Sequence, residues 1–338
     1  TIINYSVFKN SSLVGIHFRN ESKLEVIGES AFEGSIIYGF LEFPHNLVKI
    51  DKNSFKRSVL RNGSFHKVKK LQEIGIAAFQ HSTITADLIF YSSLMIISYN
   101  AFENCSNICN LRIEKDQISD KNTLIIDDNS FCHSSISGTL SIPFYVTKIG
   151  RNAFKNCHNL IEIKFENRQI NNGLLSIGDR AFYNSSISNK LTFPLYLKEV
   201  GNYAFANCQK LTGKITIYCG IFLRNVFENC SNISELEMFG GYLGPYSFIG
   251  CKKFVGPINL HNKCKIGDNA FNGFQESKFN LKLTDIDFVK IGERAFYNSS
   301  ITGSLDFPVD MIEIGKEAFA LCQFLLGDLI VDINTIGL

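Results

Sequence analysis

The stretch Ile149-Gly150-Arg151-Asn152-Ala153-Phe154-Lys155-Asn156-Cys157 contains a pattern that returns about every two dozen residues along the 338-residue chain. Aligning the copies on their shared phenylalanine gives fourteen positions: Phe8, Phe32, Phe55, Phe79, Phe102, Phe131, Phe154, Phe182, Phe205, Phe227, Phe248, Phe271, Phe296 and Phe319. Their spacing runs from 21 to 29 residues. A period in this range is typical of a solenoid, in which each unit buries its apolar face against its neighbours.

Three columns around the phenylalanine have a restricted composition. Five residues before it the side chain is apolar, as at Ile149, and four residues before it nine of the fourteen copies have glycine, as at Gly150. Glycine, Asn, Asp and Ser at that position cap helices, and the first three tolerate positive φ, so we expect a tight turn that leads into one short helical or 3₁₀ turn. The residue directly before the phenylalanine is always Ala, Ser or Val. We expect a second backbone to pass close to it, and the phenylalanine rings to stack as an internal spine.

Three residues after the phenylalanine, the column contains seven Ser, six Cys and one Phe. Because Ser and Cys are similar in size, this column predicts a small buried slot and not a reactive site. Adjacent coils would bring Cys208, Cys230 and Cys251 within disulfide range by spacing alone, but residues in the same phase point the same way, which is poor geometry for a bond. We therefore expect buried free thiols. The remaining cysteines show no metal-ligand spacing.

A strand pattern follows each turn. In the repeats with Cys, apolar residues recur six, nine and eleven positions after the phenylalanine, as at Leu160, Ile163 and Phe165, and in the repeats with Ser the first of them comes at five, as at Ile136. The apolar-polar-apolar ending has the period of a half-buried strand. One strand per repeat predicts a long parallel sheet along one side of the stack.

Composition and known motifs exclude several function classes. Lys and Arg number 34 and Asp and Glu 32, so the net charge of +2 indicates neither nucleic-acid nor anionic-membrane binding. The sequence contains no run of 18 apolar residues and no HExxH, GxSxG, P-loop or GxGxxG motif. We expect no catalysis, cofactor or metal site.

The unit that runs through Leu140-Ser141-Ile142-Pro143 and then from Val146 to Leu160 resembles the BspA-type leucine-rich repeat. The resemblance covers essentially the whole chain. It implies a β-rich leucine-rich repeat solenoid, a curved right-handed coil of about 14 repeats with a parallel sheet on the concave side. Short turns, 3₁₀ segments or short strands would line the convex side. We expect residues 1–338 to form a single such domain, truncated within a repeat at both ends.

The same resemblance implies a cell-surface or secreted protein involved in adhesion. Its expected partners are proteins or glycoconjugates on host or microbial surfaces, without nucleic-acid binding or direct membrane insertion, and self-association stays open. A signal or anchor would lie outside this sequence. Nine Asn-x-Ser/Thr sequons suit a secreted glycoprotein. A structural spacer or coat and an intracellular scaffold stay open as alternatives.

In such a solenoid, the outward positions of the concave strands are the default contact surface. Two repeats also carry extra residues after the strand, 115–122 and 167–173, and loops on a rigid scaffold often carry function. The charges at these positions are of mixed sign, and we expect no aromatic cluster among them. The predicted partner-binding residues are Arg112, Glu114, Lys115, Asp116, Glu162, Lys164, Glu166, Arg168, Lys190, Lys214, Glu235 and Glu237.

Overall fold

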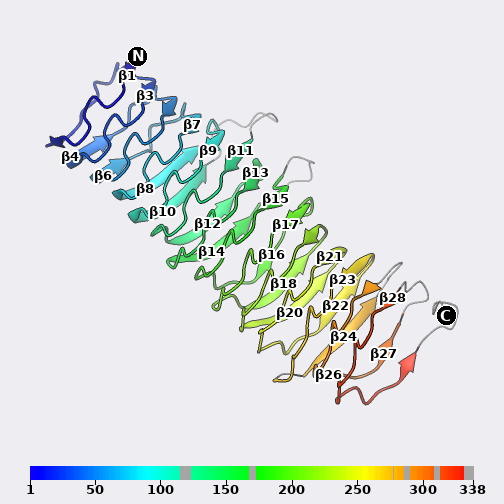
Figure 1. The fold of residues 1–338 in the computed structure, drawn as a ribbon. Helices are drawn as coiled ribbons and strands as arrows, with labels where there is room; N and C mark the ends of the chain where they lie inside the picture. The colour runs from blue at the N-terminus through cyan, green and yellow to red at the C-terminus, as the bar shows by residue number, and fades with distance from the viewer. Residues whose placement is uncertain (115–122, 167–172, 277, 285–289, 308–312, 331–338) are drawn as a thin grey trace. The chain divides into compact units, whose positions relative to one another are not determined.

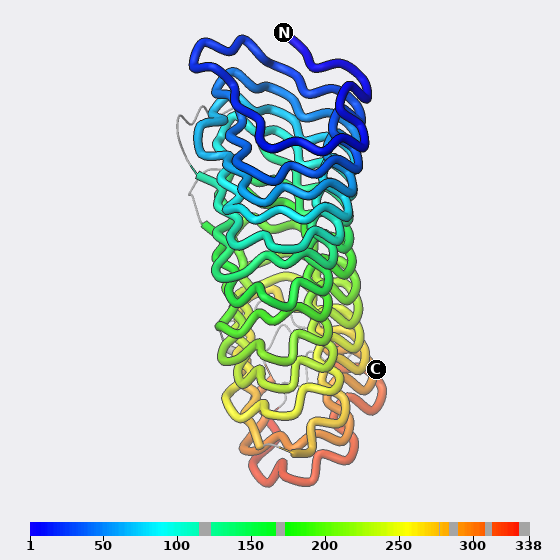
Figure 2. Tube along the Cα trace, turned by 90° about the vertical axis from the view of Figure 1, so that its left-hand side faces the viewer, coloured from blue at the N-terminus to red at the C-terminus, as the bar shows by residue number. Residues whose placement is uncertain are grey.

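The computed structural model describes residues 1–114, 123–166, 173–276, 278–284, 290–307 and 313–330. The chain divides into two compact units, residues 1–174 (unit 1) and residues 175–338 (unit 2). Each unit is a parallel β-solenoid in which one repeat makes one coil, and Figure 2 shows successive coils of each unit lying directly on one another. The predicted fold class is therefore confirmed.

A short strand precedes the turn with the repeat phenylalanine in every coil (Figure 1), and these strands pair in parallel as the short-strand sheet of each unit. In unit 1 they are β1 (Ile2–Ile3), β3 (Val26–Ile27), β5 (Lys49–Ile50), β7 (Glu73–Ile74), β9 (Ile96–Ile97), β11 (Leu124–Ile126) and β13 (Val146–Ile149). In unit 2 they are β15 (Ser176–Ile177), β17 (Glu199–Val200), β19 (Ile221–Phe222), β21 (Gly241–Leu243), β23 (Cys264–Ile266), β25 (Lys290–Ile291) and β28 (Glu313–Ile314).

The strands that follow the turn form the long-strand sheets, which are also parallel. Unit 1 has β2 (Ser12–Leu13), β4 (Ile36–Glu42), β6 (Val59–Ser64), β8 (Thr83–Tyr91) and β10 (Ser106–Glu114) in one sheet, and β12 (Gly138–Ile142) with β14 (Leu160–Phe165) in another. Unit 2 has β16 (Leu191–Thr192), β18 (Gly213–Ile217), β20 (Ile233–Met238), β22 (Ile258–His261), β24 (Phe279–Thr284) and β26 (Ile301–Thr302), with β27 (Leu305–Asp306) paired to β29 (Leu329–Ile330).

The long strands follow the predicted alternation. On β10, Ile108, Leu111 and Ile113 are buried, while Arg112 between the last two is exposed. Leu140 on β12 pairs in register with Ile163 on β14, so buried residues of adjacent coils lie side by side. This register places the apolar columns inside and leaves the alternate positions on the outer face of the sheet.

The repeat phenylalanines stack as predicted. Through unit 1, the seven rings from Phe8 to Phe154 lie 4.9–5.2 Å apart between centroids, with interplanar angles of 1–13°. In unit 2, the seven rings from Phe182 to Phe319 lie 5.0–5.8 Å apart. The interior rings are fully buried, whereas Phe8 is 37% exposed.

The turn around each phenylalanine differs from the predicted short helix. The described residues contain hydrogen-bonded turns and no helical segment. In all fourteen copies, the residues two before and two after the phenylalanine have positive φ, as at Asn152 (54°) and Asn156 (58°). Left-handed φ at both positions interrupts a helix, because a helix needs consecutive right-handed residues.

The reason predicted for glycine four residues before the repeat phenylalanine, tolerance of positive φ, was wrong. Gly150 and its equivalents do not have a left-handed φ; instead they lie against the backbone of the preceding coil. A Cβ at Gly150 would be 2.5 Å from Asp128 N, and one at Gly201 would be 2.4 Å from Asp179 N. Close approach between coils, and not backbone conformation, therefore favours glycine here.

The Ser/Cys column is buried and hydrogen-bonded. Five of its serines donate to the carbonyl of their own phenylalanine, as Ser58 does to Phe55 at 2.6 Å, whereas Ser299 donates to Phe271 O of the preceding coil at 2.7 Å. Its cysteines reach the phenylalanine carbonyl of the preceding coil, as Cys157 does to Phe131 at 3.2 Å. All ten cysteines are thiols in this structure. Burial raises the pKa of the Cys157 thiol to about 12, so it is protonated and unreactive at neutral pH.

Candidate contact surface on the long-strand sheets

The predicted contact residues of unit 1 lie on the outer face of β10 and β14. Arg112 and Glu114 are exposed on β10. Glu162 on β14 is half-buried; its carboxylate accepts a hydrogen bond from Thr139 Oγ1 (2.8 Å) and lies 3.1 Å from Lys164 Nζ. Much of the polar capacity of Glu162 is thus used within the sheet.

Glu166 directly follows β14 and is half-buried, with its backbone N–H donating to Ile142 O at 3.0 Å. Lys115, Asp116 and Arg168 lie outside the described residues, as do 115–122 and 167–172 of the two extra segments. The contact site predicted for those segments stays a prediction.

The predicted residues of unit 2 form a closer group. Lys214 on β18 lies opposite Glu235 on β20 in register, and its Nζ is 2.6 Å from Glu237 Oε2. The hydrogen bond to Glu237 raises the pKa of the Lys214 ammonium. Lys190, directly before β16, is exposed. The structure therefore brings Lys214, Glu235 and Glu237 together on one face.

An aromatic row beside this charged group was not predicted. The rings of Tyr218 and Phe239 lie 5.3 Å apart and nearly parallel (12°), and those of Phe239 and His261 lie 4.8 Å apart at the same angle. All three residues are half-exposed. The expectation of no aromatic cluster on the outward positions was therefore wrong for unit 2.

Register explains how this row arises. Ile217, Met238 and Leu260 are inward neighbours on β18, β20 and β22, so the next residue of each strand points outward in the same line. The adjacent outward line contains Thr216, Glu237, Asn259 and Lys282. His261 Nε2 lies 3.8 Å from Glu237 Oε1, which connects the aromatic row to the charged group.

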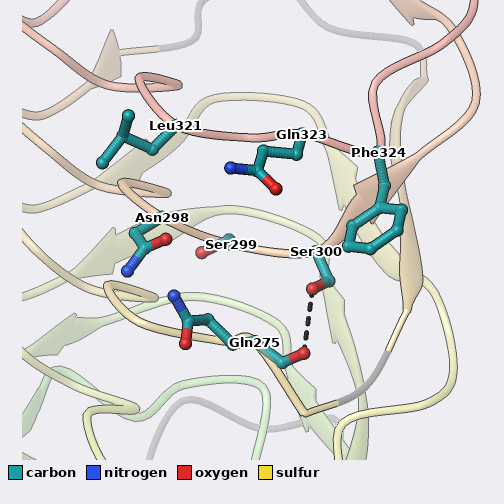
Figure 3. Close-up of a pocket in the computed structure, with 7 residues that line it drawn as sticks. All are labelled: Gln275, Asn298, Ser299, Ser300, Leu321, Gln323 and Phe324. Atoms are coloured by element: carbon teal, nitrogen blue, oxygen red, sulfur yellow. Dashed lines mark hydrogen bonds between the residues drawn. The ribbon is translucent and has the colours of Figure 1, made fainter.

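Two cavities lie farther along unit 2. The first, the lysine cavity, has a volume of about 290 Å³ and is lined by Val255, Pro257, Lys278, Asn280, Lys282 and Thr302. The second, the amide cavity, has a volume of about 250 Å³ and is lined by Gln275, Asn298, Ser300, Leu321, Gln323 and Phe324. Figure 3 shows Gln323 between Leu321 and Phe324 on one side of the amide cavity and Asn298 and Gln275 on the other, with Ser300 Oγ donating to the backbone carbonyl of Gln275 at 3.0 Å.

The described part of the chain contains no group of three or more His, Cys, Asp or Glu residues placed to bind a metal ion. Among the same residues, no helix is long and apolar enough to cross a membrane. His81 and His133 lie two residues after the repeat phenylalanine of their coils and have left-handed φ values of 58° and 57°.

Three solved structures are similar to this chain. A leucine-rich repeat protein from Bacteroides ovatus ATCC 8483 is 18% identical over 98% of this chain and 81% of that chain, with a TM-score of 0.49. The pneumococcal vaccine antigen PcpA is 18% identical over 98% and 84%, with a TM-score of 0.41. A leucine-rich cell surface protein from Faecalibacterium prausnitzii A2-165 is 14% identical over 99% and 93%, with a TM-score of 0.37.

A search of curated proteins finds no match. The family model described as the BspA type leucine rich repeat region, which contains six copies of the repeat, matches residues 1–123, 124–255 and 241–337. These matches cover nearly the whole sequence and confirm the resemblance that the repeat pattern indicated. The chain belongs to the BspA type leucine-rich repeat family.

Proposed function

We propose that this chain is a non-enzymatic binding module of a cell-surface or secreted protein, which adheres to macromolecular partners on host or microbial surfaces. The observation that carries the proposal is the half-exposed row of Tyr218, Phe239 and His261 beside the Lys214–Glu237 pair in unit 2. Large aromatic side chains are enriched at protein interfaces and at the residues that dominate binding energy.

The row suits an anchor because it is already ordered. Each ring is held by its stacked neighbour and by the strand that precedes it, so little side-chain entropy remains to be lost when a partner binds. The charged group beside it is partly exposed: the exposed fraction of the side chain is 42% for Lys214 and 22% for Glu237. Such exposed pairs contribute to partner choice and association rate more than to affinity.

The proposed location is supported by the sequons, several of which lie on exposed turns, as at Asn104 and Asn184. Membership in the BspA type repeat family supports a binding role in preference to catalysis. The predicted residues Arg112, Glu162 and Lys164 form a second candidate face in unit 1, where Glu162 is paired with Thr139 and Lys164.

The test is adhesion of the purified chain to matrix proteins and to host and microbial cells, compared across matched variants. Phe239→Ala should weaken retention of a bound partner about tenfold or more, the range for an interface anchor. Glu237→Lys should change partner choice and the salt dependence of binding. Glu199→Lys serves as the control because it makes the same charge change on an exposed residue of the short-strand sheet of unit 2.

Unchanged binding in both face variants would contradict the proposed site. If no partner is retained by the wild-type chain, the spacer alternative is favoured. Far-ultraviolet circular dichroism and thermal unfolding of each variant separate loss of contact from loss of fold.

A further inference from the structure

One side of the lysine cavity is lined by Val255, Gly256 and Pro257. Gly256 and Pro257 precede β22, and a Cβ at Gly256 would meet Glu235 Cγ at 2.1 Å. Pro257 lies beside Asn280, as the pairing of Ile258 with Leu281 requires. Val255, which is 65% exposed, lies at the border of the cavity beside Gly256 and Pro257.

The polar groups that the cavity offers are mainly hydrogen-bond donors. Asn280 and Lys282 alternate along β24 (Phe279–Thr284) and Lys278 directly precedes it, and all three residues are exposed on the outer face. Thr302 Oγ1 donates to Asn280 Oδ1 at 2.5 Å, which occupies the acceptor of that amide and leaves its Nδ2 hydrogens available. Within the described residues, neither Lys278 nor Lys282 forms an ion pair. A cavity lined by two lysines and an asparagine whose amide can donate favours an anionic ligand.

The amide cavity lies next to it and has a different character. Lys278 Nζ is 4.3 Å from the centre of the Phe324 ring, and Phe279 N donates to Ser300 O at 3.2 Å, so the two cavities share a boundary. The carboxamides of Gln275, Asn298 and Gln323 (Figure 3) can both donate and accept hydrogen bonds. Phe324 (37% exposed) and Leu321 (56% exposed) add apolar surface.

One ligand chemistry matches both cavities. An acidic saccharide has a carboxylate or sulfate for the lysines, hydroxyl groups for the carboxamides, and C–H faces for Val255, Leu321 and Phe324. An acidic peptide would match the lysine cavity equally well. Its repeated anionic side chains, however, have no cationic counterpart in the uncharged amide cavity.

We propose that the lysine cavity and the amide cavity form one binding site for an acidic oligosaccharide. A carboxylated or sulfated sugar lies between Lys278 and Lys282, and a neighbouring neutral sugar lies against Phe324 and the carboxamides. This inference names a ligand class for the binding function proposed above and rests on it.

The experiment uses the full chain produced without N-glycans, because Asn298 begins the sequon Asn298-Ser299-Ser300 and lines the amide cavity. The probes are oligogalacturonate, dextran sulfate, neutral dextran and poly-glutamate, titrated calorimetrically at low and physiological salt. We expect binding of the two acidic saccharides and not of neutral dextran. Lys282→Gln should weaken that binding about tenfold or more, the effect of losing one charged hydrogen bond.

Phe324→Ala should weaken binding of the acidic oligosaccharides and leave the fold intact, because the ring is partly exposed. Lys265→Gln is the matched control: it removes the same charge from an exposed residue of β23, on the short-strand sheet. Its binding should stay within about twofold of wild type, because screened surface charges act weakly over distance.

Several outcomes would overturn the proposal. Equal losses of saccharide affinity in Lys282→Gln and Lys265→Gln would show that the chain attracts acidic saccharides through its overall positive charge and not through this site. Failure of both acidic saccharides to bind would contradict the proposed site. Binding of poly-glutamate with the same dependence on Lys282 and Phe324 would make it an acidic-peptide site instead. If Phe239→Ala abolishes partner adhesion while the cavity variants have no effect, this inference fails and the proposed function stands.

Discussion

The stacked phenylalanines make a quantitative prediction about coupling between adjacent coils. Phe79 lies between Phe55 (5.1 Å, 2°) and Phe102 (4.9 Å, 5°), and all three rings are fully buried. Replacing Phe79 or Phe102 by Leu keeps an apolar side chain but removes the ring. Each single change should lower the free energy of unfolding by about 1–1.5 kcal/mol, the cost of a hydrophobic swap with some loss of fit.

The double variant Phe79→Leu/Phe102→Leu should be less destabilised than the sum of the singles. Each single change already removes the contact between these two rings, so the second change cannot remove it again. Aromatic pairs at this separation contribute about 0.5–1.5 kcal/mol beyond their buried area, which is the expected size of the coupling.

The assay is equilibrium urea unfolding of the four proteins, followed by circular dichroism and by hydrogen exchange to detect partial unfolding of a repeat array. Phe32→Leu with Phe102→Leu is the control pair, because two intervening rings separate these positions by about 15 Å along the stack. Distant changes add to within about 0.3–0.5 kcal/mol. Equal coupling in the adjacent and separated pairs would refute a direct contribution from stacking.

Three further predictions concern the cysteines and the glycines that lie close to the preceding coil. Burial raises the pKa of the Cys157 thiol from its ordinary value of 9.0 to about 12. The stability that the buried thiol contributes is therefore complete below pH 9 and is lost as the pH rises toward 12. Replacing it in Cys157→Ser should make the free energy of unfolding fall less between pH 8 and 10.5. The exposed thiol of Cys109 should react with a disulfide reagent at pH 8 in the folded chain, whereas Cys157 should react only on unfolding, as peptide mapping of labelled protein would show. Gly150→Ala should lower the urea midpoint of unfolding more than Gly273→Ala does. A Cβ at Gly150 would be 2.5 Å from Asp128 N, whereas at Gly273 φ is +80° but no atom lies within 4 Å of the added Cβ. The reverse order of the two midpoints would contradict the explanation that glycine is required by close approach between coils.

Repetition made the inward part of this fold predictable. A single Phe154 or Cys157 would indicate little, but fourteen aligned copies show which positions require a ring, a small residue or an apolar strand residue. The buried spine and the hydrogen-bonded Ser/Cys column follow directly from those columns. Each is fixed by contact with an equivalent residue one coil away, so the same requirement recurs in every repeat.

The turn was predicted less well because its signal lies in a different column. Asn occupies seven of the fourteen positions two residues after the phenylalanine, and Gly occupies three more. Both tolerate left-handed φ, which indicates a turn and not a helix. Arg57 adopts the same conformation without that preference, which indicates that the hydrogen bonds between coils, such as Arg57 N–H to Gln80 O (2.9 Å), determine the backbone there.

The strand pattern places Tyr218 and Phe239 at outward positions, but their stacking with each other and with His261 was not predicted, because the three residues are not in the same sequence frame. Tyr218 and His261 are 13 residues after their repeat phenylalanines, but Phe239 is only 12 after its own. The structure aligns them because the register between β18 and β20 shifts by one residue after Gly213. An alignment on the phenylalanine alone cannot show such a shift.

The row also arises from the length of the repeats that contain it. The spacings of 22 residues from Phe205 to Phe227 and 21 from Phe227 to Phe248 are the shortest in the chain. With so few residues, only Phe239 and Gly240 connect the end of β20 at Met238 to the start of β21 at Gly241, and Gly240 and Gly241 have φ of 157° and 95°. That tight connection keeps Phe239 on the outer face at the end of its strand, in line with the rings on either side. In this chain the inward columns are constrained by stacking, so a change in repeat length acts mainly on the outer face, which is where we propose that partners bind.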